Sequence, residues 1–284
     1  MNIFKDQNIC INNPKTRPFL ADCFYPDEDQ KFPLIIFAHG YKGFKDWGTF
    51  NLMAEKFAEA GFVFVKFNFS HNGTTLENPT SFDDLEAFGK NTFTKEMTDF
   101  ECVVDYFSQH PKVDSSKIAI IGHSRGGGSA ILQAFRDDRV KTLITLAGVE
   151  SFANRFPKGD RLQEYKDKGV FYSENKRTNQ NMPHYLSFYD DFIANQKELD
   201  IQHATQNLKK PFLIIHGTND EAVKLRVAHL LHKWCKTSEL FLIQNANHTF
   251  GAKEPWNNEL LPNDVQVLIE KSISFLKIKN QKQI

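Results

Sequence analysis

The sequence reads IIGHSRGGGSAI at residues 120–131, and this stretch decides the fold. A β-branched run comes directly before Ser124 and a helical pattern follows it, so the serine lies where a buried strand turns into a helix. The flanking glycines of this G-x-S-x-G pattern remove the Cβ atoms that would collide as the helix folds back over the strand. The next two glycines, Gly127 and Gly128, each cost a helix about 1 kcal/mol relative to alanine. We therefore expect this helix to start tight against the sheet.

Further apolar runs recur along the chain, separated by helical patterns. Strands that are apolar throughout are buried on both faces, and such strands alternating with helices form parallel sheets. The sequence therefore predicts an α/β fold with a mostly parallel central sheet flanked by helices on both faces. Antiparallel edge strands are expected in residues 1–25, and a final helix from about Asn263. The runs are PLIIFAHG (33–40), FVFVKFNF (62–69), KIAIIGHS (117–124), KTLITLAG (141–148), PFLIIHG (211–217) and ELFLIQNA (239–246).

One segment breaks this rhythm. About sixty residues separate the run ending at Gly148 from the run beginning at Pro211, far more than a loop and one helix need. We divide the chain into a core of residues 1–149 and 209–284 and a helical cap insertion at 150–208. The cap could be an excursion that packs its own aromatic residues, or a lid over the carboxyl ends of the strands, where open α/β sheets bind ligands. In the second case we expect aromatic side chains to wall a substrate pocket: Phe171, Tyr172, Tyr185, Phe188 and Tyr189.

A catalytic serine needs a base, and the base needs an orienting carboxylate. Asp220 follows one buried strand in IIHGTNDEAV, and His248 follows the next in QNANHTFG. Parallel neighbouring strands bring both loops to the edge of the sheet that carries Ser124. We predict Ser124 as the nucleophile, His248 as the base and Asp220 as the acid. The alternatives for the acid are Glu221, next to Asp220, and Glu150, past the strand that follows the nucleophile.

An oxyanion that develops on the substrate needs two fixed donors. The backbone N–H of Arg125, directly after the nucleophile, is one candidate. The other is the N–H of Tyr41 in FAHGYKGF, where glycine lets the backbone turn its amide toward the site. The side chains of His39 and His123 are interpreted as structural hydrogen-bonding and packing groups rather than proton carriers.

The composition narrows the partners. Lys plus Arg equals Asp plus Glu at 35 each, so no long-range field attracts nucleic acid or an anionic membrane. A small-molecule partner fits better, and the sequence does not indicate an oligomeric state. The N-terminal residues lack the pattern of a secretory signal, no stretch reaches the length of a membrane span, and the four cysteines are widely scattered. We therefore expect a cytoplasmic protein with reduced thiols.

The sequence shows no clear cofactor or metal signature. The glycine-rich stretch lacks the lysine of a P-loop and the spacing of a dinucleotide-binding motif. His229, His232 and Cys235 lie three apart on an expected helix, but the adjacent leucines and Trp234 favour amphipathic packing over a metal site. No flavin or pyridoxal signature is present. We predict no cofactor and no metal.

Taken together, the elbow GHSRGG, the HGY turn and the HGTND and NANHTF loops resemble the α/β-hydrolase superfamily, particularly small esterases similar to dienelactone hydrolases and cinnamoyl esterases, and the catalytic domains of prolyl-oligopeptidase-like enzymes. The resemblance covers about residues 17–278 and is weakest across the insertion. It implies an acyl-enzyme on Ser124. Two features depart from the family pattern. Arg125 replaces an apolar residue or glutamine, and FNFSHNGTT lacks a second glycine.

The resemblance and the residues together predict a serine hydrolase that cleaves a carboxylic ester with a small or medium acyl group. A serine peptidase acting on short peptides is one alternative, although peptidases of this architecture commonly carry a large propeller domain for which this chain has no room. A non-catalytic ligand-binding protein on the same fold is the other. An aspartate-nucleophile dehalogenase or epoxide hydrolase is excluded by the serine at position 124.

Overall fold

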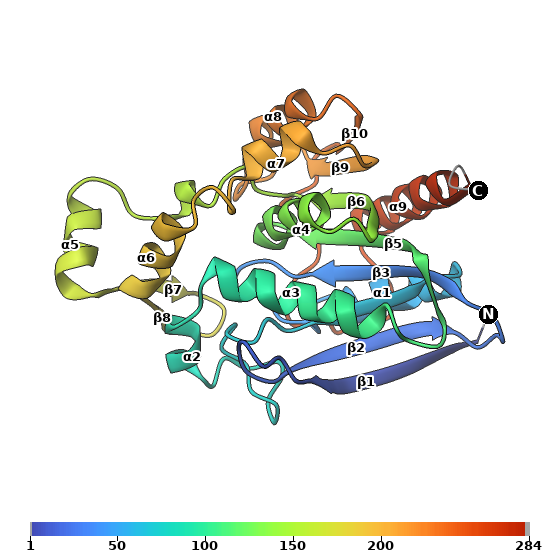
Figure 1. The fold of residues 1–284 in the computed structure, drawn as a ribbon, viewed down its shortest axis with the longest axis horizontal. Coiled ribbons are helices and arrows are strands. Elements are labelled where there is room, and N and C mark those ends of the chain that lie inside the picture. Colours follow the sequence, from blue (N-terminus) through green and yellow to red (C-terminus); the bar gives the residue numbers. More distant parts are fainter. Residues whose placement is uncertain (1, 282–284) are drawn as a thin grey trace.

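The computed structural model describes residues 2–281 and is built on a central eight-stranded sheet (Figure 1). The strand order is β1-β2-β4-β3-β5-β6-β9-β10. The β1–β2 and β2–β4 pairs are antiparallel and all later neighbours pair parallel. The predicted parallel sheet with an antiparallel edge is therefore confirmed. The strands are β1 (Ile3–Ile11), β2 (Phe19–Pro26), β3 (Phe32–Ala38), β4 (Val63–Phe67), β5 (Val113–His123), β6 (Val140–Leu146), β9 (Phe212–Gly217) and β10 (Ser238–Ile243).

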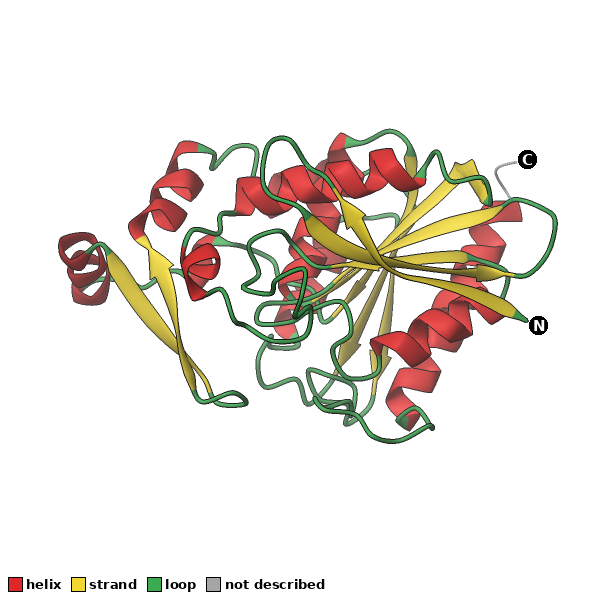
Figure 2. Ribbon diagram, turned by 90° about the horizontal axis from the view of Figure 1, so that it is seen from below, coloured by secondary structure: helices red, strands yellow, loops and turns green. Residues whose placement is uncertain are grey.

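Helices cover both faces of this sheet (Figure 2). The strands alternate between two cores, as β3 shows: Leu34 and Ile36 pack in one core, and Ile35 and Phe37 in the other. The first core is closed by α3 (Phe93–Phe107), α4 (Arg125–Arg136), α7 (Ile201–Asn207) and α8 (Arg226–Trp234). The second core is closed by α1 (Phe50–Glu59) and α9 (Asn263–Gln281).

Two helices show how local sequence sets a helix start. Thr92 caps α3 by accepting a hydrogen bond from the Lys95 amide at 3.2 Å, which satisfies one of the free amides of the first turn. The predicted terminal helix begins at Asn263. Within residues 2–281, none of the helices combines the length and the apolar character needed to cross a lipid bilayer.

The insertion extends beyond the carboxyl ends of the strands, at the left of Figure 1. It is not purely helical, because it contains a two-stranded antiparallel sheet that the sequence analysis missed. Its last helix, α7, packs against α4 in the core layer rather than with the rest of the insertion. The core segment α2 (Leu85–Gly89) lies against β8. The remaining elements of the insertion are the 3₁₀ turn η1 (Ala153–Arg155), α5 (Asp160–Lys168), β7 (Val170–Asn175), β8 (Gln180–Tyr185) and α6 (Leu186–Ala194).

Candidate active site

Ser124 lies on a strained turn between β5 and α4, with φ +55° and ψ −120°. The flanking glycines make this turn possible. A Cβ on Gly122 would lie 2.2 Å from the carbonyl oxygen of Gly126, and a Cβ on Gly126 would lie 2.4 Å from the carbonyl oxygens of Ala38 and His39. At the turn that carries Ser124, backbone therefore packs directly against backbone.

The next two glycines, directly after Gly126, allow the same close approach. A Cβ on Gly127 would lie 2.7 Å from the Cα of Gly148, and a Cβ on Gly128 would lie 2.8 Å from a side-chain carbon of Ile201. The expected tight start of the helix is confirmed. Close packing against the loop after β6 and against α7 offsets the low helix propensity of these glycines.

Ser124, His248 and Asp220 form a continuous hydrogen-bonded chain. The Ser124 Oγ lies 2.9 Å from His248 Nε2, and His248 Nδ1 lies 2.8 Å from Asp220 Oδ2. A carboxylate only accepts hydrogen bonds, so in a neutral His248 the proton lies on Nδ1, and this N–H donates a hydrogen bond to Asp220. Nε2 is then free to accept a hydrogen bond from the serine hydroxyl. This arrangement can remove a proton from Ser124.

Asp220 is fixed from several sides in a buried position. Its Oδ1 accepts from the Ala222 and Val223 amides at 2.9 and 2.8 Å, and its Oδ2 also lies 3.2 Å from Nε2 of His216. Burial by itself would raise the pKa of Asp220, but the hydrogen bonds from His216, His248 and the Val223 amide outweigh it and hold the pKa well below its usual range. The carboxylate therefore stays ionised beside His248.

The alternative acids lie elsewhere. Glu221 reaches only the backbone amide of His248, at 3.5 Å. Glu150 points toward Asn154 and Arg155. Neither carboxylate contacts the His248 ring, so the geometry favours Asp220.

The two histidines interpreted as structural do make structural contacts. His39 Nδ1 donates to the carbonyl oxygen of Gly40 at 2.8 Å, and His123 Nε2 donates to the carbonyl oxygen of His248 at 3.0 Å. Burial lowers the pKa of His39 to about 4 and that of His123 to about 3. Both rings are poor bases under these conditions, and His123 fixes the backbone that carries His248.

The two predicted oxyanion donors flank the serine. Gly40 lies directly against Ser124, because a Cβ on Gly40 would be 3.0 Å from the Ser124 Cβ, and this brings the Tyr41 amide to the site. Within residues 2–281, neither the Tyr41 amide nor the Arg125 amide donates a hydrogen bond. Both N–H groups are therefore available to a substrate oxygen.

The side chain of Arg125, the residue that departs from the family pattern, packs over the ring of Tyr41. Its guanidinium lies 4.8 Å from the centre of the Tyr41 ring and 5.8 Å from that of Phe93. Glu96, which is buried, accepts from it at 2.5 Å. Burial raises the pKa of Glu96 although Arg125 acts in the opposite direction. The charge of Arg125 is thus matched by a carboxylate from α3.

A cavity of about 450 Å³ opens beside Ser124 and His248 beneath the cap. Of the five predicted aromatic wall residues, Phe171 and Phe188 line it. The cavity also has walls that the sequence analysis missed, contributed by the core loops, α3 and the cap: Phe93, Val149, Arg155, Ser173, His184, Ala222 and Val223. Arg155, Ser173 and His184 are the members of this set with polar chemistry, and nothing local in the sequence indicated that they line a cavity with the serine.

The other three predicted wall residues lie outside this cavity, and the prediction is corrected for them. Tyr172 is 61% exposed and faces away, since alternate residues of a strand point to opposite faces. Tyr185 packs its ring against Gly89, and its hydroxyl bonds to Glu86. Tyr189 packs against Phe156 and other aromatic residues within the cap.

A smaller pocket of about 120 Å³ lies on another side of the same serine. Tyr41, Ser124 and His248 line both hollows. The small pocket is further walled by Trp47 and Phe50. Ser124 therefore lies between a large, mainly apolar cavity and a small pocket.

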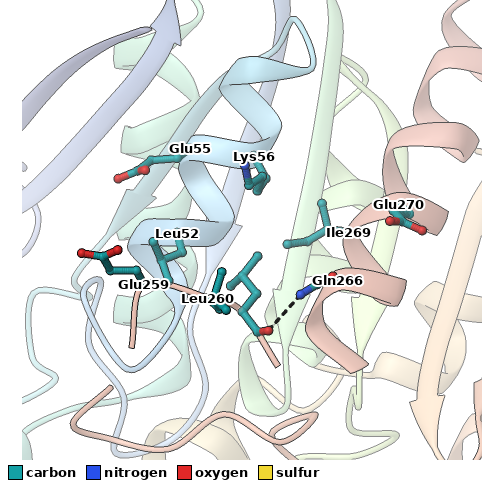
Figure 3. A pocket seen from close by; sticks show the side chains of 9 residues that line it. Leu52, Glu55, Lys56, Glu259, Leu260, Gln266, Ile269 and Glu270 are labelled. Atoms are coloured by element: carbon teal, nitrogen blue, oxygen red, sulfur yellow. Dashed lines mark hydrogen bonds between the residues drawn. The ribbon is translucent and has the colours of Figure 1, made fainter. Parts of the chain in front are cut away.

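A separate groove of about 360 Å³ lies between α1 and α9 (Figure 3). Leu52, Leu260 and Ile269 form its apolar part, and Glu55, Glu259 and Glu270 are among its polar residues. It contains no histidine, serine or cysteine. In the described residues 2–281, no three His, Cys, Asp or Glu side chains are grouped so as to hold a metal ion.

Comparison with known proteins assigns a family to the chain. A sequence model described as the prolyl oligopeptidase family matches residues 48–261. The chain belongs to this family. The mostly parallel eight-stranded sheet flanked by helices has the α/β-hydrolase fold, in agreement with the solved structures that superpose on this chain.

Est1E from Butyrivibrio proteoclasticus, solved with ferulic acid bound, superposes with a TM-score of 0.75 at 20% identity and covers 96% of this chain and 99% of its own. An acylaminoacyl peptidase from Pyrococcus horikoshii has a TM-score of 0.67 at 17% identity over 98% of this chain, which is 42% of the peptidase chain. At these identities the likeness shows the fold.

Among curated relatives, the putative esterase/lipase 2 of Mycoplasma pneumoniae is 25% identical over 243 residues, covering 76% of this chain and 82% of the relative. The match to the Escherichia coli protein YcjY is 28% identical over 141 residues, 49% of this chain and 43% of that protein. The chain thus spans less than half the length of the first curated relatives that it matches.

Proposed function

We propose that this protein is a serine hydrolase that cleaves carboxylic esters with a small or medium acyl group. The observation that carries the proposal is the hydrogen-bonded chain from Ser124 through His248 to Asp220, placed at the mouth of a mainly apolar cavity. The relatives that match over about three quarters of both lengths are named putative esterases, which supports ester cleavage.

In the proposed mechanism, Ser124 Oγ attacks the ester carbonyl while His248 Nε2 takes the hydroxyl proton. The amides of Tyr41 and Arg125 stabilise the negative oxygen of the tetrahedral intermediate. The intermediate collapses, His248 returns the proton to the departing alcohol, and an acyl-enzyme remains on Ser124. Water then attacks the acyl-enzyme with His248 again as the base, which releases the acid and restores the serine.

The two hollows beside Ser124 support an ester with one large and one small group. The large group occupies the cavity of about 450 Å³, against Phe171 and Phe188, and the small group occupies the pocket of about 120 Å³. A site of this kind needs no cofactor, because the acid–base chemistry is supplied by side chains of the chain itself. The cytoplasmic location stays a prediction.

The nucleophile can be identified with a fluorophosphonate, which reacts with activated serines, followed by mass spectrometry of the adduct. The cavity offers a stringent internal comparison, because Ser173 lies 3.3 Å from Nε2 of His184. Burial, together with the charges of Arg125 and Lys42, lowers the pKa of His184 to about 3, so it is a weak base. We expect the adduct on Ser124 alone, and loss of labelling and ester turnover in Ser124→Ala.

An adduct on Ser173, or full ester turnover by Ser124→Ala, would refute the proposal. Membership of the prolyl oligopeptidase family favours a second candidate, a serine peptidase acting on short peptides. Matched esters and amides of the same acyl groups distinguish the two. Faster cleavage of the amides would replace ester hydrolysis by the peptidase function.

A further inference from the structure

Arg155 ends the 3₁₀ turn η1 and reaches the active-site cavity from the segment that enters the cap. It lies at a junction, because Arg155 and Phe171 also line a second hollow of about 500 Å³ within the cap. The guanidinium therefore stands at the end of the cavity that leads away from the core. Its side chain is 36% exposed.

The guanidinium of Arg155 makes no hydrogen bond within the described residues, unlike that of Arg125, the other arginine of the cavity. The ion-pair partner of Arg155 is Glu150, whose Oε2 lies 3.7 Å away, too far for a hydrogen bond, and has no hydrogen-bond partner of its own among the described residues. Within residues 2–281, the side chain of Arg155 donates no hydrogen bond. Arg125, in contrast, is bonded to Glu96 at 2.5 Å and stacked on aromatic rings.

The rest of the cavity favours a negative ligand at this point. Among the described residues that line it, none is Asp or Glu, and most are aromatic or aliphatic. A guanidinium beside apolar walls attracts an anion more strongly than one in open water. Its forked donors match a carboxylate, with two parallel hydrogen bonds. Glu150 sits too far away to use these donors.

We propose that the larger group of the ester carries a carboxylate, which Arg155 binds through its guanidinium. This inference rests on the proposed ester hydrolysis and adds the substrate class: half-esters of dicarboxylic acids, or esters whose alcohol part bears a carboxylate. Arg155 acts as a specificity residue. It takes no part in the bond-breaking steps at Ser124.

The test compares kcat/KM for two pairs of esters that differ only in charge. One pair carries the charge on the acyl side: 4-nitrophenyl hydrogen adipate and 4-nitrophenyl adipamate. The other carries it on the alcohol side: 4-carboxyphenyl butyrate and 4-carbamoylphenyl butyrate. The proteins are the wild type, Arg155→Gln, Arg155→Lys and, as a matched control, Arg161→Gln. Arg161 lines the neighbouring cap hollow but not the cavity.

In at least one pair, we expect Arg155→Gln to lose roughly tenfold to a hundredfold on the charged ester and less than about twofold on the neutral one. Arg155→Lys should recover part of the loss, because it keeps the charge but not the fork. Arg161→Gln should leave both rates unchanged. The proposal would be overturned if Arg155→Gln lost equally on charged and neutral esters in both pairs. It would also be overturned if the wild type did not prefer the charged ester in either pair.

Binding of adipate itself, measured by calorimetry, separates this inference from the proposed function. Adipate has no ester bond, so its binding requires the anion subsite and no catalysis. We expect saturable binding to the wild type and to Ser124→Ala, and weaker binding to Arg155→Gln. If esters are not cleaved but adipate binds through Arg155, the proposed function fails while the subsite stands. Binding that is absent, or that is equal in wild type and Arg155→Gln, refutes the subsite.

Discussion

Replacing Asp220 by asparagine would keep the shape of the side chain and remove its charge. The amide cannot stabilise a protonated His248 and allows the ring to hold its proton on the wrong nitrogen. If the proposed mechanism is correct, we expect Asp220→Asn to lower kcat by about 10⁴-fold. The pKa of Asp220 lies well below its usual range, so at neutral pH the comparison is between an ionised carboxylate and a neutral amide. Steady-state kinetics with a 4-nitrophenyl ester measures it.

The matched controls are variants of Glu221 and Glu150, the two alternative acids considered from the sequence. Glu221→Gln changes a group that reaches only a backbone amide of the site, at 3.5 Å, and Glu150→Gln changes a group directed at Asn154 and Arg155. Both variants should keep kcat within about tenfold on neutral esters. An inactive Glu150→Gln beside an active Asp220→Asn would show that the acid is misassigned.

At the scale of elements, the β7–β8 hairpin of the cap is tied to the loop that follows β3. The Tyr41 hydroxyl lies 2.6 Å from His184 Nε2 and 2.5 Å from Ser173 Oγ. Phe171 stacks on His184, with ring centroids 4.4 Å apart. The residue that supplies a candidate oxyanion amide therefore also holds the wall of the substrate cavity, so cap position and oxyanion geometry are coupled.

We expect Tyr41→Phe to destabilise the β7–β8 hairpin of the cap. It removes the hydroxyl that His184 and Ser173 share as a hydrogen-bond partner in a partly buried position. The free energy of local opening of this hairpin should fall by about 1–3 kcal/mol. Hydrogen exchange should accelerate across residues 170–185 and stay unchanged in β3 and β5. Tyr185→Phe is the control, since its hydroxyl bond to Glu86 is at the surface. Unchanged exchange in the hairpin of Tyr41→Phe would contradict the coupling.

The strands of the core could be predicted because each is a mainly apolar run, as in β3 and β9, where nearly every residue is buried. The hairpin could not. In β7 only Asn175 is fully buried, and the strand mixes exposed and half-buried residues. Its stability comes from contacts with distant segments such as α2, which leave no periodic pattern in its own sequence.

At the scale of the whole molecule, four charged side chains form a closed buried network beside the sheet. Lys66 on β4 and Lys45 in the loop after β3 each bond to both Asp22 on β2 and Asp46. Lys45, Lys66 and Asp22 are almost completely buried. The same loop carries Tyr41 at its start, so the network anchors the candidate oxyanion segment to the antiparallel edge of the sheet.

This network predicts how stability depends on pH. Burial alone would raise the pKa of Asp46, but Lys66 and Lys45 outweigh it and lower the pKa from 3.8 to about 2. A carboxylate with a lowered pKa contributes stability above its unfolded pKa and loses it as the pH falls toward the folded value. We therefore expect the free energy of unfolding to fall by roughly 2 kcal/mol on this account between about pH 4 and pH 2.

Urea denaturation of the wild type and Asp46→Asn over this pH range measures the contribution. Asp46→Asn should be less stable than the wild type at pH 5, with a smaller further loss at acid pH. Asp29→Asn, at a fully exposed carboxylate 3.7 Å from Lys112, is the control and should follow the wild type. If Asp46→Asn and the wild type lose stability in parallel, the network does not contribute as argued.

The sequence by itself determined the sheet and the order of the candidate catalytic groups. Buried strands can be recognised from apolar runs in the local sequence. Parallel strands then bring Ser124, Asp220 and His248 to the same edge of the sheet, whatever the details of side-chain packing. Only the tertiary structure decided which cap side chains face the serine, that Arg155 lines the cavity without a hydrogen bond to Glu150, and that Tyr41 reaches His184, 143 residues away. These contacts join segments far apart in the chain, and their geometry depends on how whole elements pack, which no local pattern encodes.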